Sequence, residues 1–294
     1  MQTAEIVMKQ SSTPIVKPAT APAGIKTILF HVHSDDGLAN RIEVALSIAR
    51  AFGAHVQFLH VTPIEAYTVT DAFSVFVSPQ IMAVLEDESA KLREKLQQQL
   101  ANEDVSWSYE DVTGEMMRHL IQNAALADLV VTGRQPHERE FGGPGITLIG
   151  DMLHSIRTPL LVVGDDASKI DPFGPAIVAW NGSYEAANAL RAALPLLKIA
   201  SYVRLVTVEE KKGQQFPSTP ALEYLSRHGV HAELSERPRV MDTVEQEILA
   251  QAAIDGASYI VMGGYSHSRA GQFLFGGVTR SLLKKCSVPL FVTR

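Results

Sequence analysis

The residues best suited to binding chemistry lie in one stretch, 259–279. A short apolar run at 259–262 predicts a buried parallel strand. Two glycines follow it, then a polar and basic patch, and a second glycine pair precedes a segment with helical spacing of apolar residues. Glycine lets the backbone approach a ligand closely, and a helix N-terminus offers unpaired N–H groups to an anion. This order of strand, glycine turn, basic loop, glycine turn and helix predicts a phosphate-binding loop.

The loop matches neither of two common nucleotide-binding motifs, because no Gly-Lys-Ser/Thr follows and no Gly-x-Gly-x-x-Gly is present. It resembles instead the C-terminal signature of the universal stress protein family, a nucleotide-binding α/β superfamily. That signature reads Gly-x-x-Gly, nine residues, then Gly-Ser/Thr. Gly263 and Gly276 match it, whereas Ser266 and Gly277 replace its second glycine and its Ser/Thr. Two of the four marks are changed, so the resemblance supports the fold more strongly than it supports ATP binding.

The resemblance also implies which residues would contact ATP, which would bind with Mg²⁺. In family members an Asp after the first strand and a Val ending the second strand contact adenine and ribose, and here those positions hold Asn181 and Val208. Asn still hydrogen-bonds a nucleoside but adds no negative charge. The residues implied around the triphosphate are Gly263, Ser266, His267, Arg269, Gly276, Gly277, Val278 and Thr279. The alternative is that the glycines only make tight turns and that Arg269 is solvated.

The whole order of strands and helices occurs twice along the 294 residues. Gly133 and Gly263 are 130 residues apart, whereas the first strands, at Ile28 and Ile177, are 149 apart. The stretch from the first strand to the glycine turn is therefore longer in the first half than in the second. This difference agrees with an insertion at 62–79 and a long helix at 80–102. Repetition at this length predicts an α/β protein with two tandem, doubly wound parallel sheets. The resemblance implies that these are Rossmann-like domains of the adenine nucleotide alpha hydrolase-like type.

We expect four segments: a flexible tail at 1–25, a first universal stress protein domain at 26–164, a linker at 165–174, and a second domain at 175–294 that carries the signature loop. Ligands of such sheets bind beyond the carboxyl ends of the strands, at the topological switch point. In the second half, that edge would gather Asn181, Val208 and the loop after Gly263.

The first half departs further from the signature. Val32 stands where Asn181 stands, and Ile146 and Thr147 replace the later glycine pair. Glu138 and Glu140 lie where phosphate oxygens would need donors. We therefore expect a degenerate, structural site in the first half and any nucleotide in the second, although the glycines at 142, 143 and 145 leave a second anion nest as an alternative.

Two other groups of polar residues have side chains that could form a site. The first alternates histidines and carboxylates at a strand end and includes a histidine on the next strand: His31, His33, Asp35, Asp36 and His60. These are ordinary metal ligands, but a polar rim is the preferred interpretation, so no metal is expected. The second, Ser183, His228 and Asp242, is a conceivable hydrolase triad that lacks the Gly-x-Ser-x-Gly turn. We therefore expect no catalytic residues.

Composition bounds the function further. A net charge of −6 argues against nucleic-acid binding, and no apolar run approaches the roughly 18 residues of a membrane helix. The N-terminus lacks the apolar region of a signal peptide. Cys286 is the single cysteine, so no intramolecular disulfide is possible and a reducing, cytoplasmic location is expected.

The resemblance implies a cytoplasmic stress-response protein that senses or stores a nucleotide state, without rapid turnover, since no general base is evident in the loop. One alternative is a structural or interaction module that forms dimers and binds no nucleotide. Another is a slow ATPase that needs a metal and a positioned water. We expect assembly through the last strand of each half, at 160–163 and 290–292, because an unpaired apolar edge strand is a liability. The two halves would pair within the chain as a pseudo-dimer, and a homodimer remains an extension of this.

Overall fold

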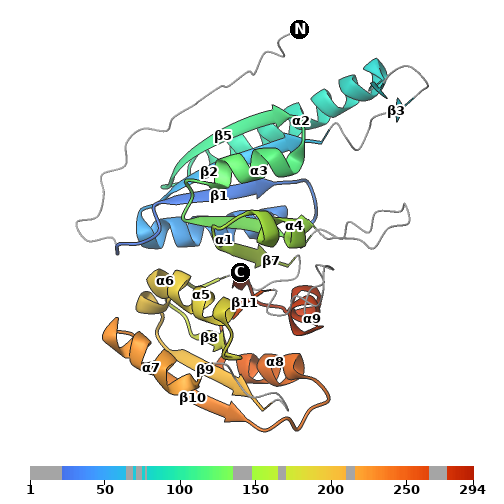
Figure 1. The fold of residues 1–294 in the computed structure, drawn as a ribbon. Coiled ribbons are helices and arrows are strands. Elements are labelled where there is room, and N and C mark those ends of the chain that lie inside the picture. The colour runs from blue at the N-terminus through green and yellow to red at the C-terminus, as the bar shows by residue number, and fades with distance from the viewer. Residues whose placement is uncertain are drawn as a thin grey trace.

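The computed structural model describes residues 22–63, 69–70, 75–76, 78–134, 148–164, 170–209, 216–264 and 277–294, with backbone alone at 69–70 and 75–76. Among these residues, ten strands form one sheet in the order β10-β9-β8-β11-β12-β7-β6-β1-β2-β5. The N-terminal half, blue to green, and the C-terminal half, yellow to red, lie end to end along this sheet (Figure 1). No helix in the described part of the chain is long and apolar enough to span a membrane.

The N-terminal half contributes β1 (Thr27–Val32), α1 (Leu38–Phe52), β2 (His55–Thr62), the short pair β3 (Val69–Thr70) and β4 (Val75–Phe76), α2 (Pro79–Leu100), β5 (Ser106–Thr113), α3 (Met116–Ala124), β6 (Leu129–Gly133), α4 (Leu148–Ser155) and β7 (Leu160–Val163). The C-terminal half contributes β8 (Ala176–Ala179), α5 (Tyr184–Ala192), α6 (Leu194–Ile199), β9 (Val203–Val208), α7 (Ser218–Arg227), β10 (Ala232–Arg237), α8 (Val244–Asp255), β11 (Tyr259–Gly263), α9 (Gly277–Lys285) and β12 (Leu290–Thr293).

Each half repeats one topology. Counting only the strands of the large sheet, the first strand of each half lies between the second and the fourth, and the fifth lies beyond the fourth. The fourth strand is β6 in the N-terminal half and β11 in the C-terminal half. Within each half, all neighbouring strands of the large sheet are parallel. The chain therefore reverses its winding direction between β1 and β6 in the N-terminal half, and between β8 and β11 in the C-terminal half. These are the two switch points at which a ligand site is expected.

The two halves join through β7 and β12, which pair antiparallel. Leu161 faces Phe291 at the centre of this pairing, and these two residues are 130 apart in the sequence. Equivalent positions thus meet each other, which relates the halves by an approximate two-fold axis through the pair. The expected pairing of the two terminal strands within the chain is confirmed.

Helices cover both faces of the sheet, and each face has its own continuous apolar core. One core lies under α1, α2, α5, α6 and α7 and includes Phe30, Phe58 and Phe291. The other lies under α3, α4, α8 and α9 and includes Met152, Ile260 and Cys286. Both cores run through residues of both halves, so the β7–β12 seam is a buried part of the molecule.

Several boundaries differ from the sequence prediction for local reasons. Apolar residues with helical spacing at 184–197 predict a single helix, but the chain forms α5 and α6, which meet at Ala193, because Pro195 in the first turn of α6 has no N–H to donate to the preceding turn. Asp242 is of a residue type that often caps helices, but the N-cap of α8 is Thr243, whose backbone N–H donates to Gln246 Oε1. Ser183, another common capping residue, does cap α5, and its Oγ accepts from the Ala186 N–H at 3.1 Å.

Candidate functional site

The carboxyl edge of the C-terminal half gathers three of the predicted residues. Asn181 follows β8 and is exposed, Val208 ends β9 and is buried, and Gly263 ends β11. Since β8 lies between β9 and β11, these residues stand on three neighbouring strand ends. The topology therefore brings them together at the switch point, although they are far apart in the sequence.

Asn181 shapes the turn that leaves β8. Its Oδ1 accepts from the Ser183 N–H at 3.1 Å, which holds the turn leading into α5. An aspartate at this position would offer two acceptor oxygens, whereas the amide offers one, already engaged, and two N–H donors. The two Nδ2 hydrogens therefore give Asn181 donors toward a ligand that an aspartate would lack.

Gly263 is required by packing. A Cβ at this position would lie 2.5 Å from the Ala186 backbone nitrogen and 2.5 Å from the Glu185 carbonyl carbon. Only glycine lets the first turn of α5 approach the end of β11 so closely. This contact accounts for Gly263 without a ligand, and it places the N-terminus of α5 directly at the switch point.

The helix that follows the signature loop begins at Gly277. Gly277 is exposed, and apart from its chain neighbours and the backbone of its own helix, no described atom lies within 4 Å of the position of an added Cβ. Val278 is half-buried and the Thr279 side chain is buried, so the accessible groups of this turn are mainly backbone. Because α9 starts after β11 and returns to the start of β12, its N-terminus lies at the same carboxyl edge as Asn181. The other predicted loop residues, Ser266, His267, Arg269 and Gly276, lie outside the described residues.

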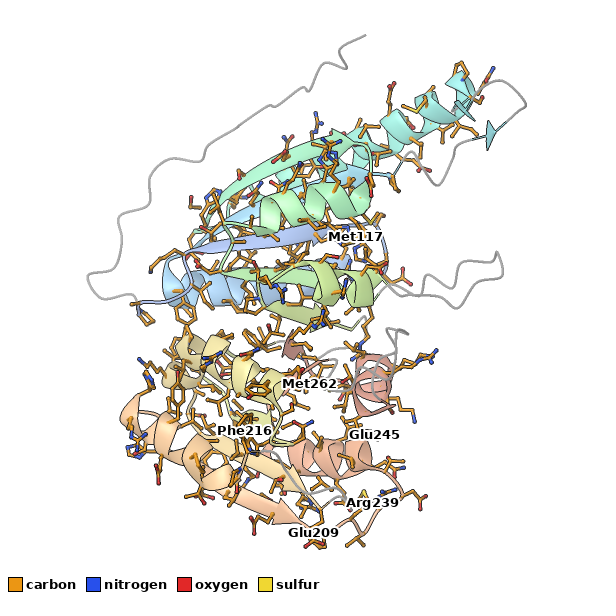
Figure 2. All side chains as sticks on the ribbon, viewed as in Figure 1. Met117, Glu209, Phe216, Arg239, Glu245 and Met262 are labelled. Atoms are coloured by element: carbon orange, nitrogen blue, oxygen red, sulfur yellow. The ribbon has the colours of Figure 1, made fainter. Side chains whose placement is uncertain are left out.

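An aromatic cluster beside Asn181 was not predicted. Trp180 Nε1 donates to the Phe216 carbonyl at 3.3 Å, and the Phe216 N–H donates to the Gly182 carbonyl at 2.9 Å. The rings of Tyr184 and Phe216 meet edge to face at 4.8 Å. Phe216 is labelled in Figure 2, with Met262 and Glu209 of the same half. The cluster ties the connection after β9 to the turn after β8, a contact that no local sequence pattern reveals.

The equivalent place in the N-terminal half is filled by the chain itself. A Cβ on Gly133 would lie 2.8 Å from Arg41 Nη1 and 2.9 Å from His33 Cε1. The Arg41 side chain is fully buried, and its Nη2 contacts Asp35 Oδ1 at 2.7 Å. Asp35 Oδ2 in turn lies 2.6 Å from His33 Nε2. Where α5 brings helix backbone to Gly263, α1 brings a charged side chain to Gly133.

The histidines considered as metal ligands have separate surroundings. His31 is buried, with Nδ1 3.2 Å from Thr132 Oγ1 and its ring 5.1 Å from the ring of His33. His60 instead contacts Asp111 Oδ1 at 3.1 Å. Within the described ranges, no three His, Cys, Asp or Glu side chains group closely enough to hold a metal ion.

Asp111 anchors the long helix α2 to the outer strands of the N-terminal half. It accepts from Ser89 Oγ at 2.5 Å and from Arg93 Nη2 at 2.7 Å, both on α2, and it contacts His60 on β2. Burial alone would raise the pKa of Asp111, but the hydrogen bonds from these three partners outweigh it, and the pKa is held below its ordinary value. Asp111 therefore fixes α2 to the sheet through charged hydrogen bonds.

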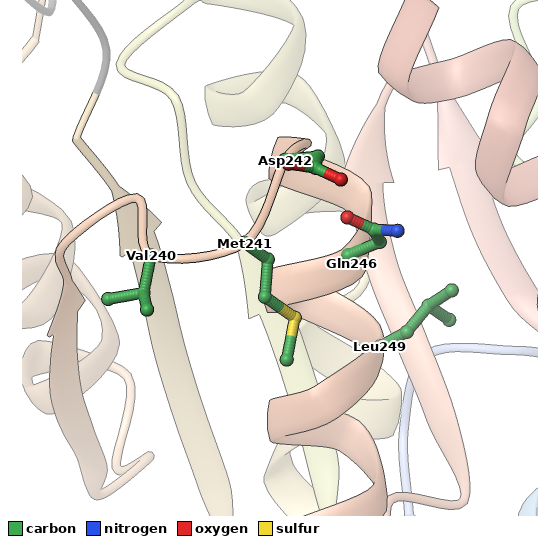
Figure 3. Close-up of a pocket in the computed structure, with 5 residues that line it drawn as sticks. All are labelled: Val240, Met241, Asp242, Gln246 and Leu249. Atoms are coloured by element: carbon green, nitrogen blue, oxygen red, sulfur yellow. The ribbon is translucent and has the colours of Figure 1, made fainter.

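A pocket of about 540 Å³ opens beside α8. It is lined by Val240, Met241, Asp242, Gln246 and Leu249, shown in Figure 3. None of the residues predicted for the nucleotide site lines it, although Asp242 of the conceivable triad does. The conceivable triad also has local explanations, since Ser183 caps α5 and the His228 ring packs 4.5 Å from the Tyr224 ring.

Comparison with known proteins identifies the family. The model of the universal stress protein family matches residues 24–163 and 172–294. The chain belongs to the universal stress protein family. It carries two tandem domains of that family, in agreement with the internal repeat and with the predicted fold class. The boundaries predicted for the tail and linker remain a prediction, although Ile25 is already buried.

Two solved structures that cover most of this chain agree on this fold. A universal stress protein from Archaeoglobus fulgidus is 15% identical, with a TM-score of 0.70 over 91% of this chain and 96% of its own. A Pseudomonas aeruginosa protein described as a universal stress protein is 16% identical, with a TM-score of 0.57 over 92% of this chain and 93% of its own. A universal stress protein in complex with cAMP, 16% identical, covers 42% of this chain and 98% of its own at a TM-score of 0.32. None of the curated protein sequences matches this chain.

Proposed function

We propose that this universal stress protein binds an adenine nucleotide, such as ATP with Mg²⁺, at the carboxyl edge of its C-terminal domain. The observation that carries the proposal is the convergence of Asn181, Val208 and the N-terminus of α9 on one switch point. The equivalent switch point of the N-terminal domain instead holds the buried Arg41 side chain, which is paired with the partly exposed Asp35. One site per chain is therefore expected.

Each group at this edge has a plausible chemical partner in the ligand. The Asn181 Nδ2 donors suit an acceptor on the ribose or the base, and Val208 offers apolar contact to the base. The N-terminal N–H groups of α9 and the positive end of its dipole suit phosphate oxygens. Gly277 adds no side chain that would hold an anion away from those N–H groups. Arg269 and His267 of the signature loop are proposed to neutralise phosphate charge.

The proposed cellular role is a cytoplasmic stress-response protein that senses or stores a nucleotide state. The rival roles are an interaction module without nucleotide and a slow ATPase. One observation bears on assembly: β7 pairs with β6 and β12, and β12 pairs with β11 and β7. Both terminal strands are thus used within the chain, so a homodimer would have to form through another surface than the one expected.

Native mass spectrometry of the purified protein, followed by calorimetric titration with ATP and Mg²⁺, tests the proposal. We expect one nucleotide per chain. Asn181→Ala should weaken binding about fivefold to tenfold, because one net hydrogen bond contributes about 1 kcal/mol. Asn181→Asp keeps the acceptor for the Ser183 N–H, so this variant should bind ATP at least as tightly as the Asn181→Ala variant does. Asp36→Ala, at an exposed position near the N-terminal switch point, is the matched control and should bind as wild type. Absence of any binding to the wild-type protein would favour the interaction module.

A further inference from the structure

Arg134, the residue after β6, reaches from the N-terminal domain to the C-terminal one. Its guanidinium lies on Gly164, where an added Cβ would be 2.6 Å from Cζ and 2.8 Å from Nη1. Nη1 also lies 3.5 Å from the carbonyl oxygen of Lys284, in the last turn of α9. A cation at this end of a helix is favourable, because the last carbonyls carry partial negative charge.

The approximate two-fold axis supplies a second, independent instance. Adding 130 to Gly164 gives Arg294, and adding 130 to His154 gives Lys284. Arg294 Nη1 lies 2.9 Å from His154 Nδ1, in the last turn of α4. Each domain thus sends one arginine across the seam to the same position on the last helix of the other domain. The arginine comes from the end of β6 on one side and from the end of β12 on the other.

The space at the two strand ends of each domain agrees with this exchange of positions. Gly264 is the equivalent of Arg134, and an added Cβ there would lie 3.1 Å from Val292 Cγ1 and 3.4 Å from Leu153 Cδ1. On the other side, Gly164 is what makes room for the Arg134 guanidinium. In each domain, one of the two strand ends at the seam therefore carries an arginine and the other carries a glycine. Arg134 and Gly164 follow β6 and β7, and Gly264 and Arg294 follow β11 and β12.

We propose that Arg134 and Arg294 form a reciprocal clasp across the seam, and that Arg134 is a positioning residue of the nucleotide site in the other domain. This rests on the proposed function. The helix α9 has nine residues and is about 13 Å long. A helix this short moves as one body, so a contact that holds Lys284 at one end also sets where the N–H groups of Gly277 point at the other. The N-terminal domain, whose own switch point is filled, thereby contributes to binding in its neighbour.

Two variants remove the clasp by different routes. Arg134→Ala deletes the guanidinium, and Gly164→Ala displaces it by the Cβ contact while leaving Arg134 in the chain. Arg118→Ala, an exposed arginine on α3 of the same domain, is the matched control. Calorimetric titration should show ATP affinity about threefold to tenfold weaker in both clasp variants and unchanged in the control. Adenosine, which has no phosphate for α9 to bind, should keep its wild-type affinity in all of them.

Amide hydrogen exchange without nucleotide gives the second readout. The segment 277–285 should exchange at least threefold faster in Arg134→Ala and Gly164→Ala than in wild type. Unchanged exchange there would overturn the clasp. Faster exchange with unchanged ATP affinity, or an equal loss of ATP and adenosine, would overturn the positioning role. If the wild-type protein binds no nucleotide, the proposed function fails with the positioning role, and the exchange result alone decides the clasp.

Discussion

The two switch points of this protein have the same topology, but different groups pack against the glycine at each. In the N-terminal domain, the glycine that ends the fourth strand faces a buried arginine, which is neutralised by Asp35 beside His33. In the C-terminal domain, the matching Gly263 faces helix backbone, and an exposed Asn181 stands beside it. The same topology thus places a charged side chain at one switch point and helix backbone at the other, and the difference lies in what the first helix of each domain brings to the glycine.

The comparison also separates two reasons for a glycine in a binding motif. Gly263 stands in the signature of a nucleotide-binding family, yet its packing against Glu185 and Ala186 requires glycine with or without a ligand. Gly277, which departs from that signature, has open space around it among the described residues. A glycine in a binding motif is therefore first explained by close packing of the backbone. It is evidence for a ligand only where the residues around it leave space for one.

The largest effect is expected at the seam that joins the two domains. Phe291→Ala removes a buried ring, and Leu161→Ala removes its equivalent on the other side of the two-fold axis. Each should lower the free energy of unfolding by about 3–4 kcal/mol, as large-to-small changes in cores do. Urea denaturation measures this, with the exposed Ile254→Ala as a control that should change stability by less than about 0.5 kcal/mol. If only one of the two substitutions lowered the free energy of unfolding, the two sides of the seam would not be equivalent.

A substitution in the signature loop should affect binding most. Gly276→Val lies outside the described residues, but the resemblance places its N–H group at the phosphates, and a branched side chain would block that approach. We expect loss of detectable ATP binding, at least about 100-fold. Ser266→Gly, which restores the signature, should leave affinity unchanged or strengthen it. Calorimetric titration measures both, and wild-type affinity in Gly276→Val would place the ligand elsewhere.

An intermediate effect is expected where the N-terminal crevice is filled. Arg41→Leu removes one partner of the pair with Asp35, and the remaining carboxylate is partly solvated, so the cost is smaller than for a fully buried pair. We expect a loss of about 2 kcal/mol in the free energy of unfolding and unchanged ATP affinity. The exposed Arg191→Ala is the control. Weaker ATP binding in Arg41→Leu would contradict the assignment of this crevice to structure.

The smallest effect concerns the outer edge of the N-terminal domain, where Asp111 holds α2. Its pKa is lower in the folded protein than in the unfolded chain, so it stabilises the fold above the unfolded pKa of about 4. This contribution is lost as the pH falls through the lowered folded value. Asp111→Asn should cost about 1 kcal/mol at pH 7. Urea denaturation at several pH values should show the gap to wild type narrowing below pH ~4, whereas a gap that persists there would exclude this linkage. Asp87→Asn, at an exposed position on the same helix, should show no gap.

The fold could be predicted because its signals are local and repeated. Short apolar runs, glycine turns and helical spacing follow the chain in the same order twice, and the 130-residue offset between Gly133 and Gly263 appears without any structure. The same reasoning places Asn181 and Val208 at one edge, since parallel strands end together. Pro195, by contrast, carried a local signal for the break between α5 and α6 that the apolar spacing of the helix obscured.

The contents of the N-terminal crevice could not be predicted in the same way. Arg41 lies one position before Ile42, on the apolar stripe of α1, and nothing near it in the sequence indicates that its side chain is fully buried. Its burial depends on Gly133, on another strand, and on the turn that presents Asp35. The aromatic cluster of Trp180 and Phe216 and the arginine clasp across the seam also depend on contacts between distant segments, which no local pattern encodes.

The most direct test of the central claim is a crystal structure of the full chain grown with ATP and Mg²⁺. We predict one nucleotide per chain, with its base near Val208, its ribose near Asn181 and its phosphates at the N-terminus of α9, while Arg41 still fills the crevice beside Gly133. A nucleotide seated beside Gly133, with Arg41 displaced, would contradict the account.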